Sequence, residues 1–451
     1  MRTAVVVGGS VAGLLAAQVL TRYADMVVVV ERDDIGADAN RAAEGNARRG
    51  VPQGTQMHAL LEGGRRGIER WLPGFTDEIA AAGAAVGNSG RDVHTYLDGR
   101  RRILVGDLPM VSATRPFLEA HIRRRVLADE RVRLHVGNAA GLVIGGGRVR
   151  GVRVTRGSAA DEDTLDADFV VDATGRASRI GSWLADHGWP EPPLRRIPVD
   201  LGYATALLRT PPGVLDGMTL GQSITHGPDG RVRVATAGRV EGDRWIALVA
   251  GYADDRPRRD SEDFLARCRD DPAEEFGKLA ANGELLGDVA VYRHPDSRRR
   301  DFHKVSRFPA GLVCVGDAVA SLNPVYGQGM SSAALHAACL ADHLDTRPGP
   351  NEPPLRYFKA VRRVVDAAWQ TSVLDDLRLP HVDAPRPWGF ALKNAIGDMV
   401  LQASVTDPKV ARKFLDVMHM LEGPDSMMRP GTLVRSVRAT RRRATGARPE
   451  Q

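Results

Sequence analysis

The first 31 residues constrain the fold of this chain more than any other stretch of its sequence. Thr3 to Val7 is a continuous apolar run rich in β-branched residues, which predicts a buried strand. Leu14 to Tyr23 has small residues on one face and predicts a helix that packs on a sheet. A second buried strand is expected at Met26 to Val30, and Glu31 ends it. This order is the strand–helix–strand unit of a parallel sheet.

The turn between the first strand and the helix reads GGSVAG over residues 8–13. It matches the dinucleotide-binding pattern G-x-G-x-x-G, except that Ser10 stands at the second glycine. Gly8 is expected to make the turn, Gly13 to let helix and strand pack closely, and the Ser10 hydroxyl to help bind a phosphate. Glu31 stands where a carboxylate binds ribose hydroxyls. The segment therefore favours a dinucleotide site over a chance glycine-rich turn.

Two later stretches also place glycine directly after a buried strand. The first, VVDATGR over residues 170–176, ends a strand that is expected to return to the first sheet. The second, over residues 313–337, runs from a strand through Gly316-Asp317 and a loop at Asn323 to Gly329 into a helix. The free N–H groups at the start of that helix are expected to face a bound anion. We interpret this stretch as the half of the site that holds the reactive end of FAD.

Length and composition agree with a protein of two or three cooperating domains, because 451 residues are enough for a large core. The hydrophobic share of 43% and the charged share of 26% are ordinary for a soluble globular chain. No stretch has the apolar length of a membrane span, and the N-terminus has no signal-peptide pattern, so we expect a cytoplasmic protein without an integral membrane segment. Cys268, Cys314 and Cys339 have no metal-binding spacing.

A modest formal charge of +6 is concentrated near the C-terminus, in RSVRATRRRATGAR over residues 435–448. Such a run can bind nucleic acid or an anionic membrane. It contains no aromatic residues for base stacking, so we expect no nucleic-acid partner and a flexible basic tail over residues 431–451.

Taken in order, GGSVAG with Glu31, VVDATGR, and VGDAVASLNPVYGQGMSSAA resemble the flavoprotein monooxygenases of the p-hydroxybenzoate hydroxylase superfamily. The resemblance spans most of residues 1–345. GVPQGTQMHALL over residues 50–61 and LNPVYGQGMSSAA look closer still to the FAD epoxidases of bacterial polyether biosynthesis.

The resemblance implies an α/β fold. A Rossmann-like FAD-binding domain of three layers (ββα) would be interleaved with an antiparallel β-sheet substrate domain and followed by a C-terminal helical cap. The implied FAD-binding domain comprises residues 1–90, 113–185 and 306–349. The implied substrate domain comprises residues 91–112 and 186–305, and the helical region residues 350–430.

The resemblance also implies the residues that bind FAD. The GGSVAG turn would contact the pyrophosphate, Glu31 the adenosine ribose, Asp317 the ribityl chain or pyrophosphate, and the amides of residues 327–331 the flavin pyrimidine edge. The full implied set is Gly8, Ser10, Ala12, Gly13, Glu31, Arg32, Arg49, Gln53, Arg115, Thr174, Gly175, Asp317, Pro324, Gly327, Gly329, Met330 and Ser331, with Arg48 as a weaker candidate.

The implied activity is an FAD-dependent monooxygenase of secondary metabolism, such as antibiotic biosynthesis. It would insert one oxygen atom from O2 into a polyketide, terpenoid or aromatic small molecule through a flavin C4a-hydroperoxide, by epoxidation or hydroxylation. Electrons would come from NAD(P)H or from a partner flavin reductase. The family usually has Asp-Gly where this chain has Thr174-Gly175, so direct nicotinamide use is in doubt.

Two alternatives share this scaffold: a non-redox FAD-containing cyclase of a polyene, and an ene or prenyl reductase. A flavin halogenase is disfavoured because no lysine precedes Lys278 and no two tryptophans are two residues apart. His58 and Tyr326 are the candidates to face flavin or substrate, although a structural role is as plausible for each. We identify no acid–base constellation, which favours an alkene-like substrate. The irregularly spaced acids and histidines between His294 and His303 predict a solvated surface and no metal site.

Overall fold

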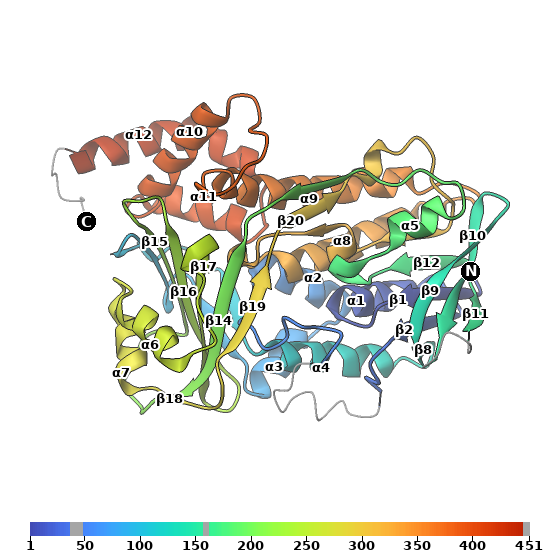
Figure 1. The fold of residues 1–451 in the computed structure, drawn as a ribbon, viewed down its shortest axis with the longest axis horizontal. Helices are drawn as coiled ribbons and strands as arrows, with labels where there is room; N and C mark the ends of the chain where they lie inside the picture. The colour runs from blue at the N-terminus through green and yellow to red at the C-terminus, as the bar shows by residue number, and fades with distance from the viewer. Residues whose placement is uncertain (37–47, 157–161, 445–451) are drawn as a thin grey trace.

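The computed structural model of the chain describes residues 1–36, 48–156 and 162–444. Part of the predicted loop over residues 37–56, and the end of the basic segment, lie outside these ranges. Figure 1 shows a two-part arrangement, with a sheet-and-helix body carrying the N-terminus on one side and a second large sheet on the other. The C-terminal helices lie along one edge of both parts.

The first body is built on a five-stranded sheet with the order β21-β12-β1-β2-β8, in which every neighbouring pair is parallel. Because the strands are parallel and in register, Val7 lies beside Val30 and Asp172, and Asp172 beside Cys314. The segments that follow these strands therefore meet at one edge of the sheet. The strands are β1 (Thr3–Val7), β2 (Met26–Glu31), β8 (Val132–Val136), β12 (Phe169–Asp172) and β21 (Leu312–Cys314).

Two further layers bury this sheet. Helices α1 (Val11–Leu20), α4 (Arg115–Leu127) and α8 (Gly329–Asp345) cover one face, with α1 packed between the other two. The antiparallel sheet β11-β10-β9 packs on β12 and β2 from the other side. Its strands are β9 (Asn138–Gly145), β10 (Arg148–Thr155) and β11 (Glu162–Asp166). The three-layer ββα arrangement expected from the sequence is thus confirmed.

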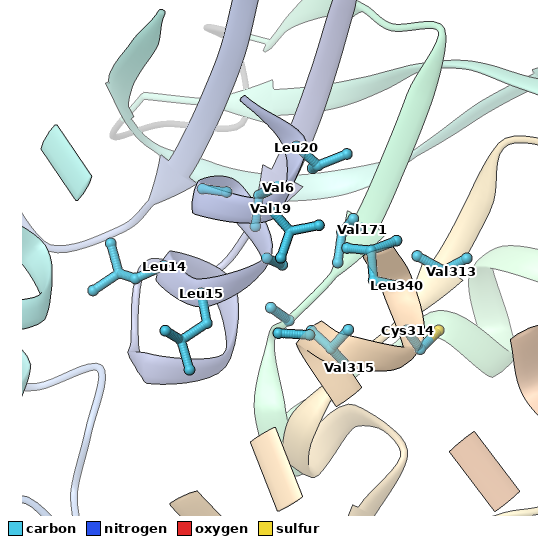
Figure 2. Close-up of a cluster of buried hydrophobic side chains, with 14 of the residues drawn as sticks. Val6, Leu14, Leu15, Val19, Leu20, Val171, Val313, Cys314, Val315 and Leu340 are labelled. Atoms are coloured by element: carbon cyan, nitrogen blue, oxygen red, sulfur yellow. The ribbon is translucent and has the colours of Figure 1, made fainter. Parts of the chain in front are cut away.

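Continuous apolar runs form the strands because both faces of the sheet are covered. Val6, Val171 and Val313 are completely buried and meet Leu15 and Leu340 from the helices (Figure 2). Each such side chain stabilises the fold by about 1.5–3 kcal/mol relative to exposure.

The second body is an eight-stranded sheet in the order β18-β14-β17-β16-β15-β5-β6, with β19 also paired to β14. All its pairs are antiparallel except β5 with β15. The strands are β5 (Val93–Leu97), β6 (Arg100–Arg101), β14 (Leu201–Arg209), β15 (Leu220–His226), β16 (Val232–Val240), β17 (Arg244–Tyr252), β18 (Glu284–Leu285) and β19 (Ala290–His294).

The C-terminal helices are α9 (Leu355–Asp376), α10 (Phe390–Ala403), α11 (Pro408–Met418) and α12 (Pro430–Ala444). The prediction of a flexible tail over residues 431–451 is wrong for residues 431–444, which belong to α12; the rest of that segment lies outside the described residues. Leu433 packs into a small apolar cluster with Val400 of α10, and Arg435 pairs with Asp407 at 2.9 Å. The many arginines of this segment mask a short apolar face, which is buried only because α10 and α11 pack against it. Across the described ranges, no helix is both long and apolar enough to cross a bilayer.

Shorter elements complete the described structure. They are β3 (Ala59–Leu60), β4 (Ala85–Asn88), β7 (Pro109–Ser112), β13 (Leu194–Ile197), β20 (Ser297–Arg300), β22 (Ala320–Ser321), α2 (Glu62–Trp71), α3 (Phe75–Ala81), α5 (Ile180–Ala185), α6 (Ser261–Arg269), α7 (Glu274–Asn282), and the 3-10 turns η2 (Gly175–Ala177), η3 (Ala253–Asp255), η4 (Phe302–Lys304), η5 (Gly316–Ala318), η6 (Pro324–Tyr326) and η7 (Pro424–Met428).

Candidate functional site

A cavity of about 1660 Å³ runs from the edge where the parallel strands end to the space between the eight-stranded sheet and the C-terminal helices. Pockets for one small molecule are typically about 300–1,000 Å³, so this cavity has room for a cofactor and a substrate together. The residues at the strand edge are polar and glycine-rich, whereas those beneath the helices are mostly aliphatic. We call the second part the apolar chamber; it is lined by Leu220, Val234, Leu248, Val373 and Leu379, among others.

The GGSVAG turn is the tightest point of the strand edge. Gly8 has φ +108°, and a Cβ there would lie 2.4 Å from the carbonyl oxygen of Ala173. A Cβ at Gly13 would lie 1.8 Å from the carbonyl oxygen of Gly8. Helix α1 therefore starts directly on β1, and its first residues, Val11 and Ala12, line the cavity without a side-chain cap. Free N–H groups at a helix start favour an anionic ligand.

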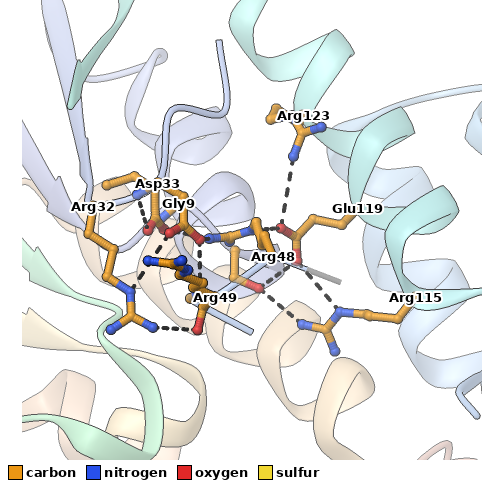
Figure 3. Close-up of polar contacts among 11 residues, drawn as sticks. Gly9, Arg32, Asp33, Arg48, Arg49, Arg115, Glu119 and Arg123 are labelled. Atoms are coloured by element: carbon orange, nitrogen blue, oxygen red, sulfur yellow. Dashed lines mark hydrogen bonds and ion pairs between the residues drawn. The ribbon is translucent and has the colours of Figure 1, made fainter. Parts of the chain in front are cut away.

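Glu31, the last residue of β2, stands beside this turn. Its Oε2 accepts a hydrogen bond from the Gly9 N–H at 2.8 Å. Arg48 reaches in from the segment after the undescribed residues and lies 3.2 Å from Glu31 and 2.9 Å from Asp33 (Figure 3). The carboxylate of Glu31 is thus held at the end of β2, facing the cavity.

A buried carboxylate, Glu119 of α4, joins this group to the glycine turn (Figure 3). It accepts from Arg48 Nε and from the Ser10 hydroxyl, both at 2.7 Å, and lies 3.6 Å from Arg115 Nε. Burial opposes ionisation, but the charges of Arg48 and Arg115 hold the pKa of Glu119 below its usual value. The Ser10 hydroxyl, which the sequence suggested for a phosphate, is therefore already bound to protein. It accepts a further bond from Arg115 at 3.0 Å.

Arginine N–H groups in this network still lack acceptors. Arg48 Nη2 is buried and has no hydrogen-bond acceptor, and Arg115 Nε forms only the 3.6 Å ion pair with Glu119 and no hydrogen bond. Both residues line the cavity next to the start of α1. Because an unpaired buried donor is costly, these groups fit an anionic ligand such as a pyrophosphate.

The DATG turn closes the floor of the strand edge. Asp172 accepts from the Thr174 hydroxyl at 2.6 Å and from the Thr174 N–H at 3.0 Å. Thr174 is therefore held by the turn itself. Arg176 is fixed by Asp296 at 2.8 Å, and Gly175 has φ +74°. At Gly175 the turn has no side chain, so its backbone can approach a ligand in the cavity closely.

Asp317 faces the cavity from η5, across from these two turns. Gly316 has φ +59°, and a Cβ there would lie 2.6 Å from the Cβ of Ala12. Desolvation raises the pKa of Asp317, while a hydrogen bond from Ser321 and the charges of Arg115 and Arg176 act in the opposite direction. The oxygens of this half-buried carboxyl can accept hydroxyl hydrogens from a ligand.

The loop predicted to face the reactive end of the cofactor borders the same cavity. It forms η6 and turns at Gly327, which has φ +67°, and α8 begins at Gly329 without a side-chain cap. The Ser331 side chain does not line the cavity and packs against α2, where a Cβ at Gly64 would lie 2.5 Å from its Oγ. Of this segment, only the N–H groups at the start of α8 are therefore available to a ligand.

The structure brings most of the predicted residues to the cavity wall. Those that line it are Gly8, Ser10, Ala12, Glu31, Arg32, Gln53, Arg115, Thr174, Gly175, Asp317, Pro324, Gly327, Gly329 and Met330. Gly13, Arg49 and Ser331 do not. Gly13 sits behind the turn, and the carbonyl oxygen of Arg49 accepts from Arg32 at 2.6 Å.

His58 and Tyr326 both line the cavity. The Nδ1–H of His58 donates to the carbonyl of Gln56 at 2.8 Å, because a carbonyl can only accept. Burial, with the charge of Arg115, lowers the pKa of His58 to about 3, so the ring is neutral. The Tyr326 hydroxyl donates to Asp375 at 3.4 Å.

The segment between His294 and His303 is not the solvated surface that the sequence predicted. His294 and Asp301 are buried, and Asp301 is paired with Arg195 at 2.7 Å and with Arg299 at 2.9 Å. Ser297 and Arg299 of β20 are buried, and Asp301 continues that alternation just after the strand, whereas His294 ends β19. Within residues 1–36, 48–156 and 162–444, no group of three or more His, Cys, Asp or Glu side chains is arranged to hold a metal ion.

Sequence reasoning missed two sets of hydrogen-bonded contacts, of which the second lines the cavity. His336 of α8 accepts a hydrogen bond from the backbone N–H of Gly316. Asn323, Asp376 and Tyr252 come from three distant segments and form a buried hydrogen-bonded group. No local pattern marks either set, since each contact is made only in the tertiary structure.

Solved structures with this architecture identify the fold. The flavin-dependent brominase Bmp2 superposes with a TM-score of 0.65 at 16% identity, over 98% of this chain and 99% of that chain. For p-nitrophenol 4-monooxygenase PnpA from Pseudomonas putida DLL-E4 the TM-score is 0.63 at 17% identity, over 94% and 100%. For the Diels-Alderase PyrE3 of the pyrroindomycin pathway it is 0.60 at 14% identity, over 94% and 81%. The chain has the fold of the FAD-dependent monooxygenases.

Sequence comparison then gives the family. Protein Rv3254 of Mycobacterium tuberculosis is 30% identical over 435 residues, which cover 93% of this chain and 90% of that protein. The chain belongs to the same family as Rv3254. Kynurenine 3-monooxygenase of Cytophaga hutchinsonii is 25% identical over 192 residues, or 42% of this chain and 40% of that enzyme. No protein-family model matches the chain.

Proposed function

We propose that this protein is an FAD-dependent monooxygenase that inserts one oxygen atom from O2 into a large, mostly apolar small molecule. One observation carries the proposal: a single cavity joins a strand edge suited to a dinucleotide with an apolar chamber suited to a substrate. Flavin monooxygenases need both ligands in one enclosed space, since the cofactor supplies the oxygen chemistry.

The residues at the strand edge fit FAD. Glu31 would bind the adenosine ribose. The start of α1, with the N–H groups of Arg48 and Arg115 that lack hydrogen-bond acceptors, would bind the pyrophosphate. Asp317 would accept from the ribityl hydroxyls. The start of α8 would stabilise negative charge at the pyrimidine edge of the flavin by about 0.3–1 kcal/mol, or more when buried. When reduced, FAD supplies the activation of O2.

This chain's own part is to bind, orient and exclude water. The eight-stranded sheet and the helices α9 to α11 enclose the apolar chamber beside the loop at 323–329. We propose a polyketide, terpenoid or aromatic metabolite as substrate, and epoxidation or hydroxylation as the reaction. We also propose NAD(P)H, used directly or through a flavin reductase, as the electron source.

A second candidate is a redox-neutral cyclase that uses the chamber to fold a polyene. The observation that favours it is the size of the apolar chamber, and the Diels-Alderase PyrE3 has the same fold. Under this alternative the flavin would be structural, and neither O2 nor a reductant would be consumed.

One experiment separates the two candidates. The purified protein is heated to release its flavin, which is identified by mass spectrometry, and FAD is expected. Photoreduced holoprotein is then mixed with ¹⁸O2 and a panel of polyene, polyketide and phenolic compounds. Incorporation of one ¹⁸O atom into a product supports the monooxygenase. Equal turnover in anaerobic, oxidised samples would establish the cyclase instead, and a protein that binds no FAD would refute both.

A further inference from the structure

A polar group interrupts the apolar chamber where it meets the loop at 323–329. Asn323 precedes η6, Tyr252 ends β17, and Asp376 ends α9. All three side chains are buried and line the cavity. Asn323 Nδ2 lies 3.1 Å from the Tyr252 hydroxyl oxygen and 2.7 Å from Asp376 Oδ1.

The orientation of the Asn323 amide follows from its partners. The backbone N–H of Val325 donates to Asn323 Oδ1 at 3.1 Å, so the oxygen must face that way. The two N–H hydrogens on Nδ2 then go to the Tyr252 hydroxyl oxygen and to Asp376. Asp376 is held in turn by the Ser297 hydroxyl at 3.3 Å. Both N–H hydrogens and the oxygen of the Asn323 amide thus have partners, which fixes its orientation.

This arrangement decides what Tyr252 can do. Its oxygen accepts from Asn323, which leaves the hydroxyl hydrogen free to be donated elsewhere. Among the described residues, no acceptor for that hydrogen lies within hydrogen-bond distance of Tyr252. The neighbouring tyrosine of the loop differs, because the Tyr326 hydroxyl already donates to Asp375. Tyr252 therefore presents an oriented donor to the cavity.

The residues around Tyr252 indicate which kind of ligand would accept a hydrogen bond from its hydroxyl. The chamber next to Tyr252 is lined by Ile224, Val232, Val234, Leu248 and Val373, none of which has a side-chain acceptor. A buried donor without an acceptor costs about 1–3 kcal/mol, which a ligand oxygen would recover. Such a ligand needs an apolar body for the chamber and one oxygen at the end near the loop.

We propose that Tyr252, oriented by Asn323 and Asp376, docks an oxygen acceptor of the substrate. The substrate class is then a large apolar molecule with a ketone, enone or quinone-type carbonyl near the loop at 323–329, and not a plain alkene. This inference rests on the proposed function, because the loop is where the reactive end of the cofactor is placed.

The test uses an isosteric pair of probes, 2-acetylnaphthalene and 2-isopropenylnaphthalene, which differ only in C=O against C=CH2. Binding of each probe to the oxidised holoprotein is measured by isothermal titration calorimetry. The wild-type protein is expected to bind the ketone about tenfold more tightly, the effect of one buried hydrogen bond. Tyr252→Phe keeps the ring and is expected to bind both probes equally, with the hydrocarbon affinity unchanged.

Tyr23→Phe is the matched control, since the Tyr23 hydroxyl bonds to Asp345 on α8, outside the cavity wall. It is expected to keep the preference for the ketone. The proposal is overturned if the wild-type protein shows no preference, whether both probes bind or neither does, or if Tyr252→Phe retains it. The flavin absorbance of each sample distinguishes this failure from failure of the proposed function, which would show as a protein without FAD.

Discussion

His336 Nδ1 accepts a hydrogen bond from the backbone N–H of Gly316 at 3.0 Å, with both groups buried. The bond ties the middle of α8 to the turn that carries Asp317. Gly316 is held in the left-handed region at φ +59°, so its N–H is directed into the helix layer and away from the cavity. The side chain of His336 thus holds the backbone turn whose next residue is Asp317.

This bond predicts how stability depends on pH. Burial lowers the pKa of His336 to about 4, whereas an unfolded histidine titrates near 6.5. The unfolded chain takes up the proton first, so this residue's contribution is lost as pH falls from about 6.5 to about 4. The loss amounts to about 3 kcal/mol. Urea denaturation at several pH values measures it.

Two variants separate the charge from the hydrogen bond. His336→Asn keeps an acceptor near the position of Nδ1 but cannot titrate, so we expect a flatter pH profile and retained FAD. His336→Leu leaves the Gly316 N–H without an acceptor and should lower the free energy of unfolding by about 1–3 kcal/mol, with weaker FAD binding. Identical pH profiles for the wild-type and Asn proteins would contradict this account.

Gly13→Ala should destabilise the protein severely, because the new Cβ would lie 1.8 Å from the carbonyl oxygen of Gly8. Either α1 moves away from β1 or the turn opens, at a cost of about 1–3 kcal/mol or more. Gly277→Ala in α7 is the control, since no atom lies within 4 Å of its added Cβ and a helical glycine gains from alanine. Thermal denaturation of both variants is the measurement; equal melting temperatures would refute the packing argument.

Asp317→Ala is expected to abolish FAD retention through purification without loss of folding stability. Desolvation raises the pKa of this half-buried acid, so its charge does not stabilise the folded apoprotein. Asp317→Asn keeps the shape and one acceptor oxygen, and should bind FAD with intermediate affinity. The flavin-to-protein absorbance ratio reports occupancy. A fully loaded Ala variant would remove Asp317 from the proposed site.

Asp376 should change stability over nearly the same pH range as His336 but in the opposite direction, and Asp376→Asn should remove that change. Burial, together with the nearby charge of Asp375, raises the pKa of Asp376 to about 7 from 3.8. The unfolded chain releases this proton first, so wild-type stability falls as pH rises from about 4 to about 7 and then levels. The Asn variant lacks that fall, which amounts to about 4 kcal/mol. Parallel denaturation curves for the two proteins across this range would show that Asp376 is ionised in the folded state.

Local patterns predicted the elements that are buried on both faces. Thr3 to Val7 and the strand from Met26 appear at the expected positions, because a covered parallel strand must be apolar throughout. Amphipathic or charged segments were harder to predict. The basic segment after Pro430 became a helix because α10 and Asp407 provide partners for it. The strand β6 consists of Arg100 and Arg101 alone, and it forms because Tyr96 and Leu97 pair with it.

The sequence by itself determined the strand edge: glycine at positions 8, 13 and 316 and acids at 31 and 317 are local requirements of tight turns after buried strands. The tertiary structure alone decided which of those groups remain free for a ligand. The Ser10 hydroxyl donates to Glu119, and Ser331 packs against Gly64 away from the cavity lining. Arg48 and Tyr252, in contrast, line the cavity and keep donors without acceptors. The physical reason is that hydrogen-bond satisfaction depends on neighbours from distant segments, and no spacing along the chain records which neighbours arrive.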